Sequence, residues 1–389
     1  AVEELARGGQ RVSAGLEPLL SDEPLTGSIE KAKAQFGMAA THLGEVDKNL
    51  AGVRVDVIPD ELQDDFHSLQ VLVPRAHDLL NQFSSQADAL LYVLGSNQDR
   101  QYLVLLANNH ELRPVGGFIG TIALVDIDEG EVEAIDVSSV YDGDGQLKEF
   151  IAPPDQLRPI TDRWYLRDSN WFLDYEVSAR KAAEFFEKEG GPTVDGVILM
   201  TPDLIQRLLA VTGPISVPGY DTTVSTENFV EVTQDEVTYS YDKELNRPKQ
   251  FLADLTPILL DRILGQQEST LATIGALTQA LAHKEMLLYM RSDEIQNQLR
   301  EVGWAGTIPQ DVPGLLYVNN ANIGGHKTDQ FIEQEIDYRL QLLENGDVEA
   351  IVTIRRTHTG PFAEISSDFP EGEDPTIKNN IVYQRVLVP

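Results

Sequence analysis

Apolar residues in the first 97 positions recur with the period of packed helices. One series, in which Ile29, Phe36, Leu43 and Leu50 take part, repeats every seven residues. A second series alternates steps of four and three, in the order Leu62, Phe66, Leu69, Val73, Ala76, Leu80, Phe83, Ala87, Leu90 and Leu94. A spacing of this kind predicts helices packed at a shallow angle. Residues 51–59 break the period, so we predict a helical hairpin or small bundle over residues 1–97 that acts as a stalk or spacer.

After the turn-forming stretch 95–100, apolar runs of strand length alternate with amphipathic runs of helix length. Strands are predicted over 102–107, 120–127, 132–137, 194–200, 286–290 and 315–318, and helices over 178–189, 202–211, 250–264, 269–282 and 293–301. This alternation favours a mixed sheet with helices on both faces. We therefore predict an α/β domain over residues 98–328.

From about Thr328 the period changes to two. Apolar residues then occupy every second position on both sides of Asn345-Gly346, a dipeptide typical of tight hairpins. We predict a C-terminal antiparallel β unit over residues 329–389. Its last strand, over 381–388, has no closing element after it, so we expect the natural chain to continue.

The composition of the chain excludes several kinds of binding partner and of functional site. The chain has 63 acidic and 30 basic residues, a formal net charge of −33, which predicts no binding to nucleic acid or to anionic lipid surfaces. Cysteine is absent, which excludes disulfides, thiolate zinc sites and cysteine nucleophiles. No segment has the length and apolar purity of a membrane span. Because the chain begins at Ala1, any signal or anchor is expected to precede it.

Polar loops follow two of the predicted strands. The run from Tyr102 ends in Asn108 and Asn109, and Glu111, Arg113 and a glycine pair follow. The strand over 315–318 runs into a loop over 319–327, which also has a glycine pair and a cation. Such joints are where α/β proteins usually keep their sites. Between them, aromatic residues flank Arg167-Asp168, which predicts a partly buried charged pair.

Two interpretations of these charges remain open. The scarce cations Arg113, Arg167, Arg247, Lys249 and Lys327 fall in polar loops or at helix starts, as in a phosphate-binding site. Glu111, Asp168 and Asp174 would then hold Mg²⁺ or act as a general base. Alternatively, the cations pair locally with the same carboxylates. The sequence contains no P-loop, no G-x-G-x-x-G, no G-x-S-x-G and no H-E-x-x-H.

Four stretches resemble a bacterial extracytoplasmic family that is defined only as a domain of unknown function. They are NNHELRPVGGFIG, WYLRDSNWFLDY, VDGVILMTPDLIQRLLAVTGPISV and ANIGGHKTD. The resemblance implies a cell-envelope protein on the outer side of the membrane. Its members carry an N-terminal transmembrane helix, a helical spacer, this α/β domain and a β-rich tail, so an anchor that precedes this chain is expected.

A fainter resemblance reaches the LytR-CpsA-Psr phosphotransferases, through Arg113, Leu166-Arg167-Asp168-Ser169 and the strand-helix-glycine run 194–217. It implies Arg113, Arg167 and Asp168 as catalytic residues, and Asn109, Arg247, Lys249 and Lys327 as substrate-binding residues. Mg²⁺ would be held by Glu111, Asp168 and Asp174. The chain departs from that family at Arg113-Pro114-Val115-Gly116, where one expected metal-binding aspartate is missing.

The resemblances lead to two functional hypotheses. In the first, the protein transfers a glycopolymer from a polyprenyl-pyrophosphate carrier to a cell-wall glycan acceptor, with Mg²⁺. In the second, it is a non-catalytic surface or scaffold protein of the envelope that keeps the fold and assembles with other envelope proteins or with itself. An apolar tunnel beside Arg113 and Arg167 would favour the first hypothesis, and a filled core there the second.

Overall fold

A computed structural model describes residues 2–20, 24–54, 58–238, 250–265, 270–309, 312–324, 327–360 and 379–388. Contacts within the chain divide it into two compact units. Unit 1 comprises Ala1–Leu106, Thr121–Ser139 and Pro192–Thr307, and unit 2 comprises Ala107–Gly120, Val140–Gly191 and Ile308–Pro389. The units interleave along the sequence, and the predicted boundaries near residues 97 and 328 stay predictions. Among the described ranges, no helix combines the length and the apolarity that crossing a membrane requires.

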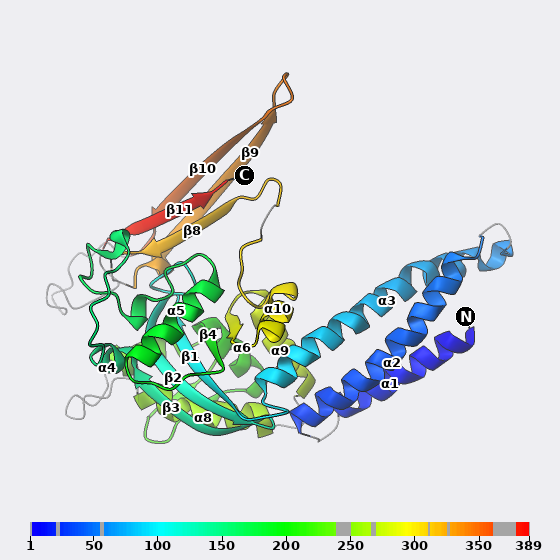
Figure 1. The fold of residues 1–389 in the computed structure, drawn as a ribbon, viewed down its shortest axis with the longest axis horizontal. Helices are drawn as coiled ribbons and strands as arrows, with labels where there is room; N and C mark the ends of the chain where they lie inside the picture. Colours follow the sequence, from blue (N-terminus) through cyan, green and yellow to red (C-terminus); the bar gives the residue numbers. More distant parts are fainter. Residues whose placement is uncertain are drawn as a thin grey trace. The chain divides into compact units, whose positions relative to one another are not determined.

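Unit 1 begins with three helices that run side by side (Figure 1): α1 (Val2–Leu19), α2 (Leu25–Ala51) and α3 (Asp60–Val93). The predicted seven-residue repeat is confirmed, because Ile29, Phe36, Leu43 and Leu50 are all buried in α2. Phe36 packs edge-on against Phe83 of α3, with ring centroids 4.9 Å apart. The segment that breaks the period lies between α2 and α3, as predicted.

The rest of unit 1 is built on a five-stranded mixed sheet of order β3-β2-β1-β4-β7. Its strands are β1 (Arg100–Asn108), β2 (Phe118–Asp128), β3 (Glu131–Ser139), β4 (Gly196–Met200) and β7 (Met286–Met290). β1 and β4 are parallel, with Tyr102 opposite Gly196, whereas β4 and β7 are antiparallel. The predicted mixed α/β architecture is therefore confirmed.

Helices cover one face of this sheet. Tyr102 and Val104 of β1 lie in one apolar cluster with buried side chains of α3 and of four further helices, α6 (Pro202–Thr212), α8 (Gln250–Gly265), α9 (Thr270–Ala282) and α10 (Asp293–Glu301). Helix α7 (Phe229–Thr238) adds Phe229 to the cluster. The short pair β5 (Ile215–Ser216) and β6 (Thr223–Val224) contributes Ile215 and Val224. β1 is buried along most of its length.

The described part of unit 2 contains two α-helices, three 3₁₀ turns and the C-terminal strands. Its helices are α4 (Val140–Asp144), α5 (Tyr175–Lys188) and the 3₁₀ turns η2 (Asp155–Leu157), η3 (Leu166–Asp168) and η5 (Asp329–Phe331). β8 (Tyr317–Asn322) pairs antiparallel with β11 (Val382–Leu387), and β9 (Ile332–Leu342) pairs antiparallel with β10 (Val348–His358). The predicted C-terminal antiparallel unit is confirmed.

One prediction about this region is wrong. The polar stretch that begins at Asn319 is not a loop, because β8 continues through Asn319 and Asn320 to Asn322. Asparagine is depleted in strands, which is why the strand was expected to stop at residue 318. The side chains of Asn319 and Asn322 instead find hydrogen-bond partners inside unit 2, and these bonds offset the low strand propensity.

Candidate functional site

The loop over residues 109–117, which connects β1 to β2, is folded tightly on itself. The amide of Glu111 donates to the carbonyl of Asn108 (3.1 Å), and that of Phe118 donates to the carbonyl of Glu111 (2.8 Å). Gly116 has φ +71°, which favours glycine. A side chain at Gly117 would place its Cβ 2.0 Å from the carbonyl oxygen of Asn108. The positive φ therefore accounts for Gly116, and close backbone packing requires Gly117.

Buried side chains of distant segments hold the backbone of this loop. The side-chain nitrogen Nδ2 of Asn170 donates to the backbone carbonyls of Val115 and Gly117, both at 2.7 Å. The side-chain nitrogen Nδ2 of Asn319 donates to the backbone carbonyl of Pro114 (2.8 Å). The carboxylate of Asp329 accepts from the backbone N–H of Leu112 (2.9 Å). These bonds satisfy backbone groups that the tight loop cannot pair itself. The loop is thus fixed to η3, β8 and η5.

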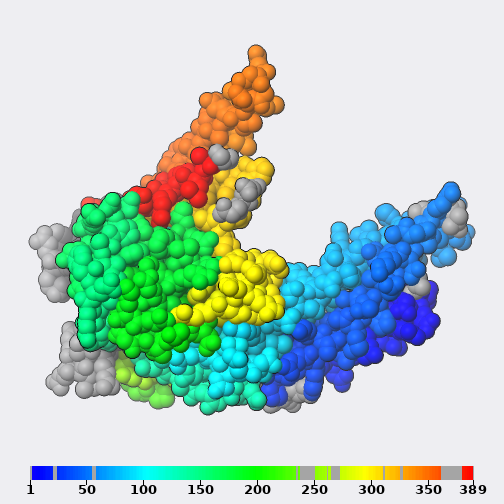
Figure 2. Space-filling view, viewed as in Figure 1, coloured from blue at the N-terminus to red at the C-terminus, as the bar shows by residue number. Residues whose placement is uncertain are grey.

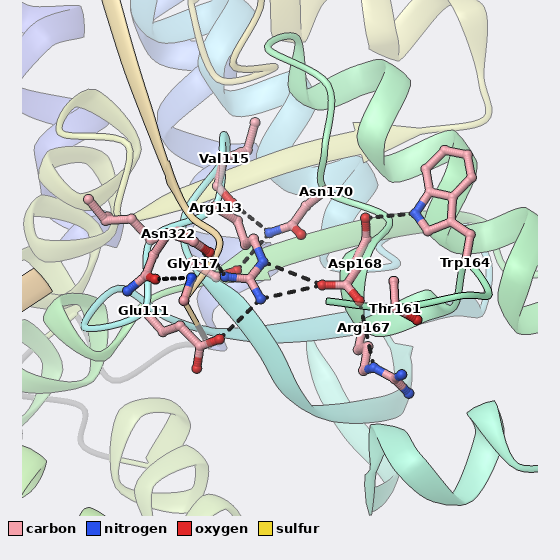
Figure 3. Close-up of polar contacts among 12 residues, drawn as sticks. Glu111, Arg113, Val115, Gly117, Thr161, Trp164, Arg167, Asp168, Asn170 and Asn322 are labelled. Carbon is pink, nitrogen blue, oxygen red and sulfur yellow. Dashed lines mark hydrogen bonds and ion pairs between the residues drawn. The ribbon is translucent and has the colours of Figure 1, made fainter. Parts of the chain in front are cut away.

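Arg113 lies at the centre of the site (Figure 3), with its side chain 2% exposed. Its guanidinium makes five hydrogen bonds. Nη2 donates to the carboxylate of Glu111 (3.0 Å), and Nη2 and Nε both donate to the carboxylate of Asp168 (3.4 Å each). Nη1 donates to the backbone carbonyls of Asn322 (2.7 Å) and Leu112 (3.3 Å). A guanidinium has five N–H groups, so protein acceptors use its whole donor capacity.

Arg167 extends the charged network from Asp168 to α4. Its Nε lies 3.6 Å from Asp168 Oδ2, and its Nη1 donates to Asp144 Oδ2 at 2.6 Å. The guanidinium carbon also lies 4.3 Å from the ring centroid of Tyr165. The side chain of Arg167 is 21% exposed, whereas those of Asp144 and Asp168 are 3% and 4% exposed. The predicted partly buried Arg167–Asp168 pair is confirmed.

Burial dominates the electrostatics of the carboxyl groups. It raises the pKa of Glu111 and of Asp144, although Arg113 and Arg167 respectively oppose the shift. Burial, together with the adjacent Asp144 carboxyl, also raises the pKa of Glu189 to about 8. Burial lowers the pKa of Lys327, which interacts electrostatically with Glu111. A like-charged pair such as Asp144 and Glu189 is stable when one member keeps its proton.

The structure brings most, but not all, of the predicted site residues together. Glu111, Arg113, Arg167 and Asp168 form one network, and Lys327 lies near Glu111. Asn109 lies in the turn directly after β1. Asp174 instead caps α5, where its carboxylate accepts from the amide of Glu176 at 3.0 Å. Arg247 and Lys249 lie outside the described residues.

The described residues do not fit a magnesium site of the predicted kind. They contain no cluster of three or more acidic or histidine side chains that could hold a metal ion. The guanidinium of Arg113 bonds to both Glu111 and Asp168, and so supplies the positive charge that a metal would supply between these two carboxylates. The third predicted ligand, Asp174, is engaged as a helix cap. We therefore assign no step to Mg²⁺ bound by these residues.

Several residues that build the site were not expected from the sequence. Asp144, Asn170 and Asp329 are not among the predicted site residues, and Asn319 and Asn322 were expected in a loop. Asn319 and Asn322 lie within β8, where buried polar side chains usually have a hydrogen-bond partner, but this placement is known only from the structure. For Asp144, Asn170 and Asp329 the sequence offers no signal either.

Replacing Arg113 by methionine is predicted to destabilise unit 2 strongly. The substitution keeps an unbranched side chain but removes the guanidinium that bonds to the buried carboxylates of Glu111 and Asp168, which costs about 3–5 kcal/mol. Arg339→Met is a matched control, because Arg339 is 74% exposed and pairs with the exposed Asp337, an interaction that contributes about 0–1 kcal/mol. Free energies of unfolding from urea titration measure both effects.

A combined variant separates charge imbalance from lost packing. Adding Glu111→Gln and Asp168→Asn to Arg113→Met removes the uncompensated carboxylates, so part of the lost stability should return. If Arg113→Met is no more destabilising than Arg339→Met, the charged network does not contribute to stability and the structural role assigned to Arg113 is wrong.

The stability of the protein is predicted to depend on the protonation of Glu189. Its pKa is about 8 in the folded state, against the ordinary value of 4.5 when unfolded, so the folded state holds the proton more tightly. The stabilisation is complete below about pH 4.5 and is lost as the pH rises through about 8. Glu189→Gln should therefore gain stability relative to the wild type between about pH 5 and pH 8, in thermal melts at both values. Glu187→Gln, at an exposed position of the same helix, should show no such gain, and equal behaviour of the two variants contradicts the assignment.

Comparison with known proteins matches one part of the chain to a family model. None of the curated proteins compared with the chain matches it. The matched segment, residues 97–238, runs from just before β1 to the end of α7 and includes Arg113, Arg167 and Asp168, but not the asparagines of β8. The resemblance to a domain of unknown function is confirmed for this part: residues 97–238 match the family model described as "Protein of unknown function (DUF4012)".

Proposed function

We propose that this protein is a non-catalytic assembly or scaffold protein of the bacterial cell envelope, located outside the cytoplasm, in which the charged network of unit 2 is structural. The location rests on the family resemblance of the sequence. The structural role rests on the geometry of Arg113.

The observation that carries the proposal is the complete use of Arg113 by the protein. In a pyrophosphate clamp, this guanidinium would have to offer N–H groups to the substrate. Its five hydrogen bonds go to Glu111, Asp168 and two carbonyls, and its side chain is 2% exposed. An incoming phosphate would have to break these bonds and would leave the buried carboxylates of Glu111 and Asp168 without the guanidinium that bonds to both, which is costly.

The balance of charge supports the same conclusion. Among the described residues, the network brings together four carboxyl groups, those of Glu111, Asp144, Asp168 and Glu189, with three cations, Arg113, Arg167 and Lys327. A site that binds pyrophosphate needs an excess of cations or bound metal ions. This network supplies neither, so its geometry suits mutual neutralisation.

Glycopolymer transfer from a polyprenyl-pyrophosphate carrier is the second candidate function, and the position of Arg167 favours it. The guanidinium of Arg167 lies 4.3 Å from the Tyr165 ring centroid and is 21% exposed, so part of it remains accessible to a phosphate. Lys327, which interacts electrostatically with Glu111, would add a second cation. In this function any Mg²⁺ would arrive with the pyrophosphate, since the described carboxylates do not form a metal site.

Binding of a polyprenyl-pyrophosphate analogue in the presence of Mg²⁺ tests the two functions. The scaffold proposal predicts no saturable binding by the wild type up to about 1 mM in calorimetric titration. Arg167→Ala should behave in the same way. Arg158→Ala is the matched control, because Arg158 is 62% exposed and pairs only at the surface with Asp155.

The opposite result is equally specific. Micromolar binding by the wild type and by Arg158→Ala, lost in Arg167→Ala while that variant remains folded, would overturn the scaffold proposal. It would assign pyrophosphate recognition to Arg167.

A further inference from the structure

The hairpin β9–β10 is strongly two-sided. Its register places four apolar pairs on one face: Ile336 opposite Ile354, Tyr338 opposite Val352, Leu340 opposite Ala350, and Leu342 opposite Val348. The other face carries the ion pairs Arg339–Asp337 (2.7 Å) and Arg355–Glu335 (2.5 Å). This alternation is the pattern of a sheet with one buried and one solvated face.

The apolar face is nevertheless open towards the tip of the hairpin. Leu340 is 57% exposed, Leu342 74% and Val348 59%. The hairpin is a separate two-stranded sheet among the described strands, and Figure 2 shows its tip as a narrow orange arm. A lone two-stranded hairpin is marginally stable in water, and an exposed apolar strand face favours association. This surface therefore has the properties of an unoccupied binding face.

The charge around the open face indicates what it binds. The turn at the tip of the hairpin carries Glu344 and Asp347, and residues 340–354 contain no lysine or arginine. The whole chain carries a formal net charge of −33, which disfavours face-to-face contact between two copies. A partner with basic residues beside an apolar strand would be attracted to the same surface.

We propose that the apolar tip of β9–β10, formed by Leu340, Leu342, Val348 and Ala350, docks an extended segment of another protein in which apolar and basic residues alternate. The apolar side chains of that segment cover the hairpin face. Its lysines or arginines nearest the turn lie beside Glu344 and Asp347. This inference deepens the assembly role proposed above and rests on it.

Peptide binding tests the proposal on the full chain. The probe is a fluorescent peptide as long as β9 in which valine and lysine alternate, and its binding is followed by anisotropy at physiological salt. Leu340→Asn should weaken binding by about tenfold or more. Ile351→Asn is the matched control, because Ile351 is also exposed (47%) but lies on the charged face opposite Arg339, and it should change binding by less than about twofold.

Three results would overturn the proposal. Equal weakening by the two variants would show that the peptide is held by the general acidity of the chain. Equal affinity for a valine–glutamate peptide would exclude charge recognition. A wild-type dimer in sedimentation velocity that Leu340→Asn dissociates would identify a second copy as the occupant. Both hairpin variants leave Arg113 and Arg167 unchanged, so pyrophosphate binding measured on the same samples reports separately on the proposed function.

Discussion

The buried guanidinium of Arg113 is the interaction on which the organisation of unit 2 depends. Its hydrogen bonds join all three stretches of the chain that make up the unit: the loop after β1 through Glu111, η3 through Asp168, and β8 through the carbonyl of Asn322. A buried cation requires compensating partners, and a buried carboxylate requires the same. Each member of the network therefore constrains the positions of the others. The tight loop, with Gly117 packed against Asn108, brings Arg113 to the place where those partners converge.

The same constraint shapes the functional interpretation. An arginine in a polar loop beside a glycine pair is compatible with phosphate binding when only the sequence is considered. In the structure, the N–H groups of Arg113 are already bonded to acceptors of the protein, and a phosphate would have to compete with these acceptors. Arg167 differs in this respect, since it retains partial exposure beside Tyr165. The distinction between a saturated and a partly available guanidinium is thus the physical basis for preferring a scaffold role.

The sequence predicts elements better than it predicts the site. The seven-residue repeat through Phe36 and the alternation on both sides of Asn345-Gly346 are local patterns, and both correspond to observed elements. The pairing of cations with nearby carboxylates was one of two open interpretations, and the structure favours it for Arg113 and Arg167. The principal acceptor of Arg113 Nη1 could not be predicted, because Asn322 lies 209 positions away and contributes a backbone carbonyl, which carries no residue-specific signal.

The most direct test of this account is the nitrogen-15 NMR signal of the Arg113 side chain in arginine-labelled protein, assigned by comparison with Arg113→Lys. If the guanidinium is fully bound by the protein, its Nε–H proton will exchange slowly with water. Its chemical shift will also stay unchanged when inorganic pyrophosphate and Mg²⁺ are added. Rapid exchange, together with a saturable shift on addition of pyrophosphate, would show that Arg113 is available to a ligand and would contradict the structural role assigned to it.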